Sequence, residues 1–347
     1  MRAATLTAYR QPLEILDAPE PACLDDGVVL SVLACGVCRS DWHAWSGADP
    51  DIELPQIPGH EFCGVVEEVG PAVAGWRRGD RAIAPFILAC GRCPDCAAGN
   101  QTACGAQIVP GFTAPGAFAE RVAVPRAAVN LAPLPEGMDP AVAAGLGCRA
   151  TTAWHGLTGR ADLKAGEWLA VHGAGGVGLS AILIARALGA RVVAVDVADD
   201  KLSVAAALGA EAVVNAAATD AAEAIRDVTG GGAHVSLEAL GIEETTAASI
   251  RCLRKLGRHV QIGMPAGDQA AMRLPMDAVY SGQLALYGTR GMPAWRFPSL
   301  FALIETGAVD FAPLVTRRVA LSQVSAELAA MDGPTPPGVA VVIDFAA

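Results

Sequence analysis

Four cysteines stand close together in residues 89–104, which read ACGRCPDCAAGNQTAC. The spacing C-x2-C-x2-C-x7-C lets four thiolates surround one Zn²⁺ ion tetrahedrally; two disulfides or four idle thiols are the alternatives. A four-thiolate site has no open coordination position, so it can hold a loop in place but is poorly suited to activating a substrate. We therefore expect a structural zinc ion on Cys90, Cys93, Cys96 and Cys104.

Two other segments carry residue types that bind metals or move protons. CGVCRSDWH, residues 35–43, contains Cys38, Ser40, Asp41 and His43, and PGHEFCGVVEEVG, residues 58–70, places His60 beside Glu61. Neither segment is specific by itself, because a lone cysteine or histidine is more often structural than catalytic. A turn residue at Ser40 and a packed or exposed side chain at His43 are the plain alternatives.

A glycine-rich segment indicates dinucleotide binding. VHGAGGVG, residues 171–178, places Gly173, Gly175 and Gly178 in G-x-G-x-x-G spacing, with Gly176 and Val177 inside the same turn. An apolar run precedes it, a helix-like stretch follows it, and the next apolar run ends in Asp196. In this βαβ order the glycines let the backbone approach a pyrophosphate at a helix N-terminus, and the acid binds ribose hydroxyls.

The elements that would position these groups fall into two parts. Apolar runs near residues 167–171, 191–196, 211–215, 233–240, 257–264 and 283–288 predict about six strands. Helix-like stretches at 178–190, 220–230 and 243–257 lie between them, so we expect a doubly wound α/β sheet over residues 150–287. Residues 1–149 are rich in Gly, Pro and short β-like runs and predict a β-rich domain of non-parallel strands. GVAVVIDF, residues 338–345, is expected to return to that domain.

Length and charge narrow the class of protein. The 347 residues exceed one ordinary hydrophobic core, so two domains are expected. The formal charge of −11, without a basic run, argues against nucleic acid or an anionic membrane as partner. No secretory signal is recognised, which favours the cytoplasm and disfavours disulfides. The apolar run at 168–185 is interrupted by glycines, so we do not expect it to span a membrane.

Taken together, the motifs resemble the zinc-dependent medium-chain alcohol dehydrogenase family over essentially the whole chain. GVCRSDWH, PGHEFCGVV, GDRA, the four-cysteine segment, GCRATTAWH and GAGGVG occur in the family's order. The resemblance implies a GroES-like catalytic domain, residues 1–149 with 288–347, whose structural zinc lobe is residues 86–106. It also implies a Rossmann domain, residues 150–287, and two zinc ions and one NAD per chain.

The resemblance also implies a role for each matching residue. Cys38, His60 and Cys148 would bind a catalytic zinc ion, with Asp41 orienting the His60 ring and Glu61 close behind the metal. Ser40 would take the substrate's proton and pass it through the ribose hydroxyls toward His43, and Phe86 would line the substrate pocket. The implied cofactor contacts are Arg39, Thr152, the glycine turn at 173–178, Asp196, Lys201, Ile262 and Met264.

Charge favours Cys148 over Glu61 as the third protein ligand. Two thiolates and a neutral imidazole cancel the charge of Zn²⁺ and leave a position for an alcohol, whereas a fixed glutamate would close that position. The alternative is that Cys148 is a buried residue at a helix start.

We expect an NAD-dependent alcohol dehydrogenase that interconverts a small-molecule alcohol with its aldehyde or ketone and assembles as a homodimer or homotetramer. A polyol or amino-alcohol dehydrogenase is the nearest alternative, although polyol enzymes commonly use glutamate where this chain has Cys148. A nucleotide-binding zinc protein without turnover is the alternative from another class.

Overall fold

The computed structural model describes residues 1–333 and 336–346, and the chain forms two compact units. Unit 1 comprises Met1–Thr151, Gly291–Ala302 and Ala312–Ala347, and unit 2 comprises Thr152–Arg290 and Leu303–Phe311. Residues 303–311 pack in unit 2, whereas the sequence analysis grouped them with the catalytic domain; the predicted domain limits stay a prediction. No helix among the described residues is long and apolar enough to cross a membrane.

Unit 2 is built on a six-stranded sheet in which every neighbouring pair is parallel. Its spatial order is β10-β9-β8-β11-β12-β13, which is the 3-2-1-4-5-6 order of a dinucleotide-binding fold. The strands are β8 (Trp168–His172), β9 (Arg191–Asp196), β10 (Ala212–Asn215), β11 (Ala233–Glu238), β12 (Leu253–Gln261) and β13 (Ala285–Gly288). The chain order reverses between β8 and β11, and ligands of such sheets bind beyond the carboxyl ends of the strands at this point.

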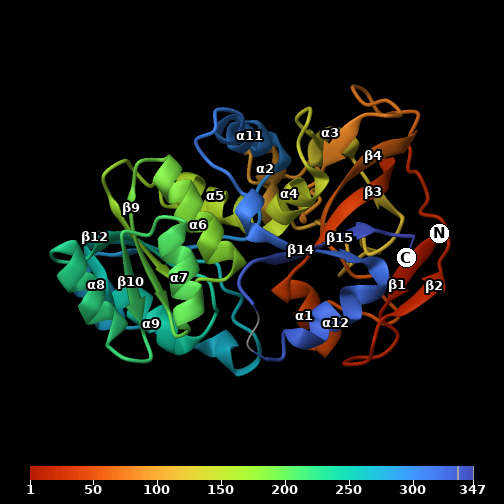
Figure 1. Cartoon of the computed structure of the whole chain (residues 1–347). Helices are drawn as coiled ribbons and strands as arrows, with labels where there is room; N and C mark the ends of the chain where they lie inside the picture. Colours follow the sequence, from red (N-terminus) through yellow and green to blue (C-terminus); the bar gives the residue numbers. More distant parts are fainter. Residues whose placement is uncertain (334–335, 347) are drawn as a thin grey trace. The chain divides into compact units, whose positions relative to one another are not determined.

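Helices connect these strands and cover the sheet (Figure 1). Helices α6 and α7 contact β8, β9 and β10, while α8, α9 and α10 contact β10, β11 and β12 among others. The α-helices between residues 151 and 290 are α5 (Thr151–Trp154), which starts at the last residue of this part of unit 1, α6 (Gly176–Ala187), α7 (Asp199–Ala207), α8 (Ala221–Thr229), α9 (Glu243–Arg251) and α10 (Met276–Gly282). Val193 and Val195 of β9 share a buried apolar cluster with Ile225 of α8, which explains the apolar character of this strand in the sequence.

Unit 1 contains a seven-stranded sheet centred on β3 (Val28–Val37) and β4 (Glu61–Val69). Apart from the parallel pair β14 and β15, neighbouring strands are antiparallel. The remaining strands are β5 (Arg81–Ile83), β6 (Arg121–Val124), β7 (Ala132–Pro133), β14 (Val315–Ala320) and β15 (Val339–Asp344), and a two-stranded sheet joins β1 (Arg2–Thr5) to β2 (Glu14–Asp17). The pairing of β15 with β3 bears out the predicted return of the C-terminal segment.

Short helices in unit 1 carry the residues of chemical interest. They are α1 (Arg39–Ser46), α2 (Pro94–Ala97), α3 (Ala127–Asn130), α4 (Pro140–Gly145) and α12 (Val324–Ala330), while α11 (Phe297–Glu305) runs on into residues of unit 2. A π-helical turn, Leu146–Ala150, follows α4 directly. Such turns are rare and often occur at functional sites.

One expectation from the sequence needs correction, and one strand was not predicted. The helix expected over residues 243–257 ends at Arg251, because Leu253–Gln261 is a strand that pairs with β11 across a register shift. Within that strand Leu256 is 71% exposed and adopts φ 62°, a turn-like conformation that ends any helix. Strand β14 was not predicted and pairs in parallel with β15, whereas the strands within residues 1–149 pair antiparallel, as predicted.

Candidate active site

Cys38 lies at the junction of β3 and α1, where the chain leaves the sheet and starts a helix. Its backbone is extended, and its N–H donates to Asp41 Oδ2 at 2.8 Å, which anchors the first turn of α1. A hydrogen bond from the Cys148 thiol, aided by the nearby Arg149 guanidinium, holds the pKa of Cys38 well below its usual value despite burial. The same hydrogen bond, together with burial, raises the pKa of Cys148.

His60 is oriented by the other oxygen of the same carboxylate. His60 Nδ1 lies 2.9 Å from Asp41 Oδ1, which also accepts the Gly59 N–H at 3.1 Å. Burial alone would lower the pKa of His60, but the Asp41 carboxylate offsets this and the pKa lies well above its usual value. Asp41, which belongs to the same segment as Cys38, thus links that segment to the one that carries His60.

These segments bring four potential metal ligands together. One ligand atom from each of Cys38, His60, Glu61 and Cys148 lies within 4.8 Å of all the others, and we call this group the mixed cluster. His60 Nε2 is buried and has no hydrogen-bond partner among the described residues. Thiolate sulfur and imidazole nitrogen are preferred Zn²⁺ ligands, and a buried nitrogen without a partner is costly unless a ligand satisfies it. The residues therefore fit a zinc ion.

Glu61, the fourth member of the mixed cluster, forms a buried ion pair. Its Oε2 lies 2.6 Å from Arg149 Nη1, while its Oε1 is buried without a partner among the described residues. Burial raises the pKa of Glu61 to about 8, although the Arg149 charge acts in the opposite direction. Arg149 was not singled out from the sequence; its position directly after Cys148 was the only available signal.

Phe86 and Ser40, which were predicted from the sequence, and Phe112, which was not, each contact a member of the mixed cluster. The rings of Phe86 and Phe112 stand edge-on to His60, with centroids 5.8 Å and 5.4 Å away. Ser40 Oγ lies 3.9 Å from Cys38 Sγ. His43 Nδ1 is buried without a partner among the described residues, and burial lowers the pKa of this ring.

Arg39, predicted to pair with a pyrophosphate, is exposed and engaged within unit 1. Its Nη1 donates to the Met331 carbonyl at 2.6 Å, and its guanidinium lies 4.8 Å from the centre of the Trp42 ring. Its cofactor role stays a prediction.

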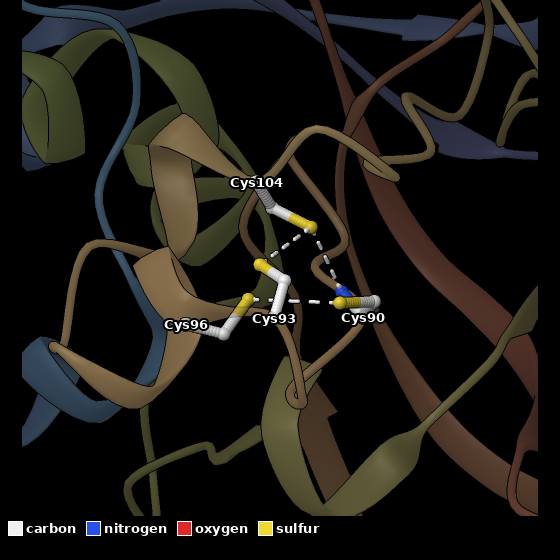
Figure 2. A group of neighbouring side chains, drawn as sticks. All are labelled: Cys90, Cys93, Cys96 and Cys104. Atoms are coloured by element: carbon white, nitrogen blue, oxygen red, sulfur yellow. Dashed lines mark hydrogen bonds between the residues drawn. The ribbon is translucent and has the colours of Figure 1, made fainter.

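The four-cysteine cluster consists of Cys90, Cys93, Cys96 and Cys104, shown in Figure 2. All four sulfur atoms lie within 4.8 Å of one another, and the pairs Cys90–Cys96 and Cys93–Cys104 are both 3.9 Å apart. These separations are far longer than a disulfide bond of about 2.05 Å, and all four cysteines are free. The arrangement therefore fits a closed four-thiolate zinc site rather than two disulfides.

Buried polar contacts fix the loop that holds these cysteines. The side chain of Asn130 accepts the Ala89 N–H at 2.8 Å and donates to the Ala89 carbonyl at 3.0 Å. Gly91 adopts φ 73°, and an added Cβ there would lie 2.6 Å from the Val129 side chain, so this turn requires glycine. At the surface, Trp295 Nε1 donates to Gln101 Oε1 at 3.0 Å.

We expect Cys96→Ser to lose one zinc ion and to lower the unfolding temperature, because a structural zinc site contributes directly to folding free energy. Residual turnover should persist, since the mixed cluster is intact. Cys252→Ser is the matched control: this thiol is also buried, yet belongs to neither cluster, so both zinc ions should remain. Zinc analysis with thermal unfolding checks this, and a Cys96→Ser protein of unchanged stability that lacks only turnover would contradict a structural role.

The glycine turn of unit 2 forms the tight β8-to-α6 connection expected for a pyrophosphate. Gly173 adopts φ 97°, and an added Cβ at Gly178 would lie 1.9 Å from the Gly173 carbonyl oxygen, so both positions require glycine. Gly175 caps α6, nothing lies within 4 Å of an added Cβ there, and Gly176 and Val177 begin the helix. The backbone N–H groups of such a helix start are an anion site, and the cradle fits a dinucleotide.

Asp196 ends β9 and is held by backbone groups. Its Oδ2 accepts from Ala174 N at 2.8 Å, and its Oδ1 accepts from Val197 N and Ala198 N at 2.9 Å and 3.1 Å. The carboxylate is thereby fixed beside the glycine turn. The other predicted cofactor residues of unit 2 lie in α5, in α7 and after β12: Thr152 is buried, Lys201 and Ile262 are half-buried and Met264 is 42% exposed.

Comparisons with known proteins agree with this architecture. Residues 25–136 match the model of the alcohol dehydrogenase GroES-like domain, and residues 176–306 match that of the zinc-binding dehydrogenase. An alcohol dehydrogenase of Geobacillus stearothermophilus is 37% identical over 270 residues, covering 76% of this chain and 78% of that protein. The crystal structure of an NAD-dependent alcohol dehydrogenase has a TM-score of 0.90 at 30% identity, covering 99% of this chain and all of the other. The structure of an alcohol dehydrogenase from Thermus sp. ATN1 has a TM-score of 0.91 at 28% identity, again covering 99% of this chain and all of that one.

Proposed function

Because the chain belongs to the zinc-dependent medium-chain alcohol dehydrogenase family, we propose that it interconverts an alcohol with its aldehyde or ketone, using NAD as the hydride carrier. The observation that carries this proposal is the mixed cluster. Two thiols and one imidazole come together there, and the imidazole nitrogen His60 Nε2 is buried without a partner among the described residues. The Rossmann order of unit 2 and its glycine cradle support the cofactor assignment.

We assign Cys38, His60 and Cys148 as the ligands of the catalytic zinc ion. The bound zinc would lower the pKa of the substrate hydroxyl, and the nicotinamide would accept the hydride. Asp41 keeps the His60 ring in one orientation through the 2.9 Å contact, so that Nε2 is the free ring nitrogen. Phe86 and Phe112 exclude water from one side of that ring.

The hydroxyl proton needs a route to solvent, and we assign its first acceptor to Ser40 Oγ. The contact of 3.9 Å between Ser40 Oγ and Cys38 Sγ keeps this hydroxyl beside the mixed cluster. His43 lies one helical turn further along α1, and its buried Nδ1 lacks a partner among the described residues. We propose that His43 releases the proton at the outer end of this relay.

Asp196 should make the enzyme prefer NAD over NADP. Its carboxylate would accept the ribose hydroxyls and repel a 2′-phosphate, a like-charge cost of several kcal/mol that corresponds to a preference of about 100-fold or more. Asp196→Ser should lower kcat/KM for NAD⁺ and also reduce the preference for NAD⁺ over NADP⁺. Both effects are measured as kcat/KM with each cofactor. Asp200→Ser removes an exposed carboxylate nearby and is the control with unchanged preference. Comparable kcat/KM values for NAD⁺ and NADP⁺ in the unaltered enzyme would contradict the assignment.

A panel of primary, secondary, aromatic and polyhydroxy alcohols, each tested for NAD⁺ reduction, tests the activity and defines the substrate class. Preferred oxidation of simple alcohols supports the proposal, whereas exclusive use of polyhydroxy alcohols would favour the polyol alternative. NAD binding without turnover of any alcohol would favour the non-catalytic one. Two zinc ions per chain, a homodimer or homotetramer and a cytoplasmic location stay predictions, which zinc analysis, sedimentation and localisation experiments address.

A further inference from the structure

The guanidinium of Arg149 forms hydrogen bonds to both the segment that carries Cys38 and the segment that carries His60. Arg149 follows Cys148 directly in the π-helical turn, and its side chain is 8% exposed. Its Nη1 donates to Glu61 Oε2 at 2.6 Å, and its Nη2 donates to the carbonyl oxygen of Val37. Because a guanidinium is planar and offers several donors in fixed directions, these bonds tie the turn to β4 and to the end of β3 at once.

Each group that Arg149 touches is a sequence neighbour of a predicted ligand. Val37 precedes Cys38, Glu61 follows His60, and Arg149 itself follows Cys148. The three ligands come from a strand end, a strand start and a helical turn that are otherwise far apart in the sequence. Residues that orient metal ligands in this way influence metal affinity although they never touch the metal.

Two glycines make room for the carboxylate that Arg149 binds. An added Cβ at Gly36, opposite Glu61 in the β3–β4 pairing, would lie 2.2 Å from Glu61 Oε2. An added Cβ at Gly147 would lie 2.9 Å from Glu61 Cα. The ion pair therefore occupies space that side chains at these two positions would fill.

The ion pair with Arg149 restrains a Glu61 carboxylate whose other oxygen, Oε1, has no hydrogen-bond partner among the described residues. Glu61 belongs to the mixed cluster, so a ligand atom of this carboxylate lies within 4.8 Å of the potential ligand atoms of the other three residues. Its Oε1 has no hydrogen-bond partner among the described residues, whereas its Oε2 is held by Arg149. Without the guanidinium, the fully buried Glu61 carboxylate would lose this ion pair and would be free to compete for the metal.

We propose that Arg149 is a positioning residue for the metal: it braces the three ligand-bearing segments and holds Glu61 as an ion-pair partner rather than as a ligand. This inference rests on the proposed function, which places zinc on Cys38, His60 and Cys148. It assigns to Arg149 the retention of that zinc ion, separately from any general contribution to folding.

The rate of zinc release to a chelating dye tests the proposal on the holoenzyme. A kinetic phase of zinc release that the unaltered enzyme shows and Cys148→Ala lacks is assigned to the zinc ion of the mixed cluster. Arg149→Met should accelerate this phase by about 10- to 100-fold, the usual effect of removing a group that orients metal ligands. The matched control is Arg258→Met, because Arg258 likewise binds a carboxylate, Glu167, and the backbone carbonyl of Ala161, but within unit 2. Its release phase should be unchanged even if its unfolding temperature falls.

A second pair of variants covers the case in which Arg149→Met does not fold. The double variant Glu61→Gln with Arg149→Met leaves no unpaired charge at this position and should release zinc faster than Glu61→Gln alone, because the link to Val37 is absent. Equal release rates in these two proteins, or an unchanged rate in folded Arg149→Met, would overturn the proposal. If the unaltered enzyme and Cys148→Ala show the same release phases, the assignment of zinc to Cys38, His60 and Cys148 fails instead.

Discussion

Cys148→Ala is expected to contain one zinc ion where the unaltered enzyme contains two, and to lose nearly all activity while still binding NAD. Lewis-acid stabilisation by a metal is worth several kcal/mol, and each 1.36 kcal/mol is a tenfold change in rate, so we expect a loss in kcat/KM of about 10³-fold or more. Zinc analysis, NAD titration and kinetics on the same preparation measure the three properties. NAD binding should survive because the glycine turn and Asp196 belong to unit 2, whereas Cys148 belongs to unit 1.

Cys63→Ala is the matched control for this substitution. Cys63 is likewise a cysteine of unit 1, but its thiol is buried, donates to the Pro140 carbonyl and belongs to neither cluster. Its loss should lower stability by the cost of a small cavity and leave both zinc ions and turnover in place. If Cys148→Ala kept two zinc ions and normal turnover while Glu61→Gln lost one, the ligand set proposed here would be wrong.

Ser40→Ala is expected to retain both zinc ions and NAD affinity but to slow turnover by about 10²- to 10⁴-fold, the usual effect of losing a positioned proton-transfer group. Ser46→Ala, at the other end of α1, removes a hydroxyl that donates to the His43 carbonyl and should leave kcat unchanged. His43→Ala should slow turnover less than Ser40→Ala, since solvent can replace the outer member of a relay. If kcat of Ser40→Ala were nearly unaltered across pH, Ser40 would be a turn residue without a role in proton transfer.

Much of the fold could be predicted because its signals are local. The six strands of unit 2 are runs of apolar residues, and Gly173 and Gly178 mark a turn that no other residue type fits. The four-cysteine cluster follows from spacing alone, since its members lie within 15 residues, from Cys90 to Cys104. The error over residues 243–257 arose where tertiary pairing of Leu253 with Ala233 outweighed a helix-like local sequence.

The mixed cluster depended on contacts that composition and periodicity do not reveal. Cys38, His60 and Cys148 could be grouped from the family resemblance and a charge count, and the structure brings their ligand atoms together. Arg149 was missed because its partners, Glu61 and Val37, lie 88 and 112 residues away in the sequence. A buried cation of this kind has no local pattern, and only the three-dimensional arrangement shows what it binds.

The most direct test of the account follows NADH formation from NAD⁺ and alcohols while zinc is removed and restored. A chelator treatment that removes the zinc of the mixed cluster should abolish alcohol-dependent NADH formation, and added Zn²⁺ should restore it in proportion to the zinc bound by that cluster. This result is predicted because that cluster, unlike the four-cysteine cluster, leaves a coordination position for substrate. If the fully zinc-loaded enzyme reduces NAD⁺ with none of the alcohols in the panel, or if the protein without this zinc turns over at the original rate, the central claim is contradicted.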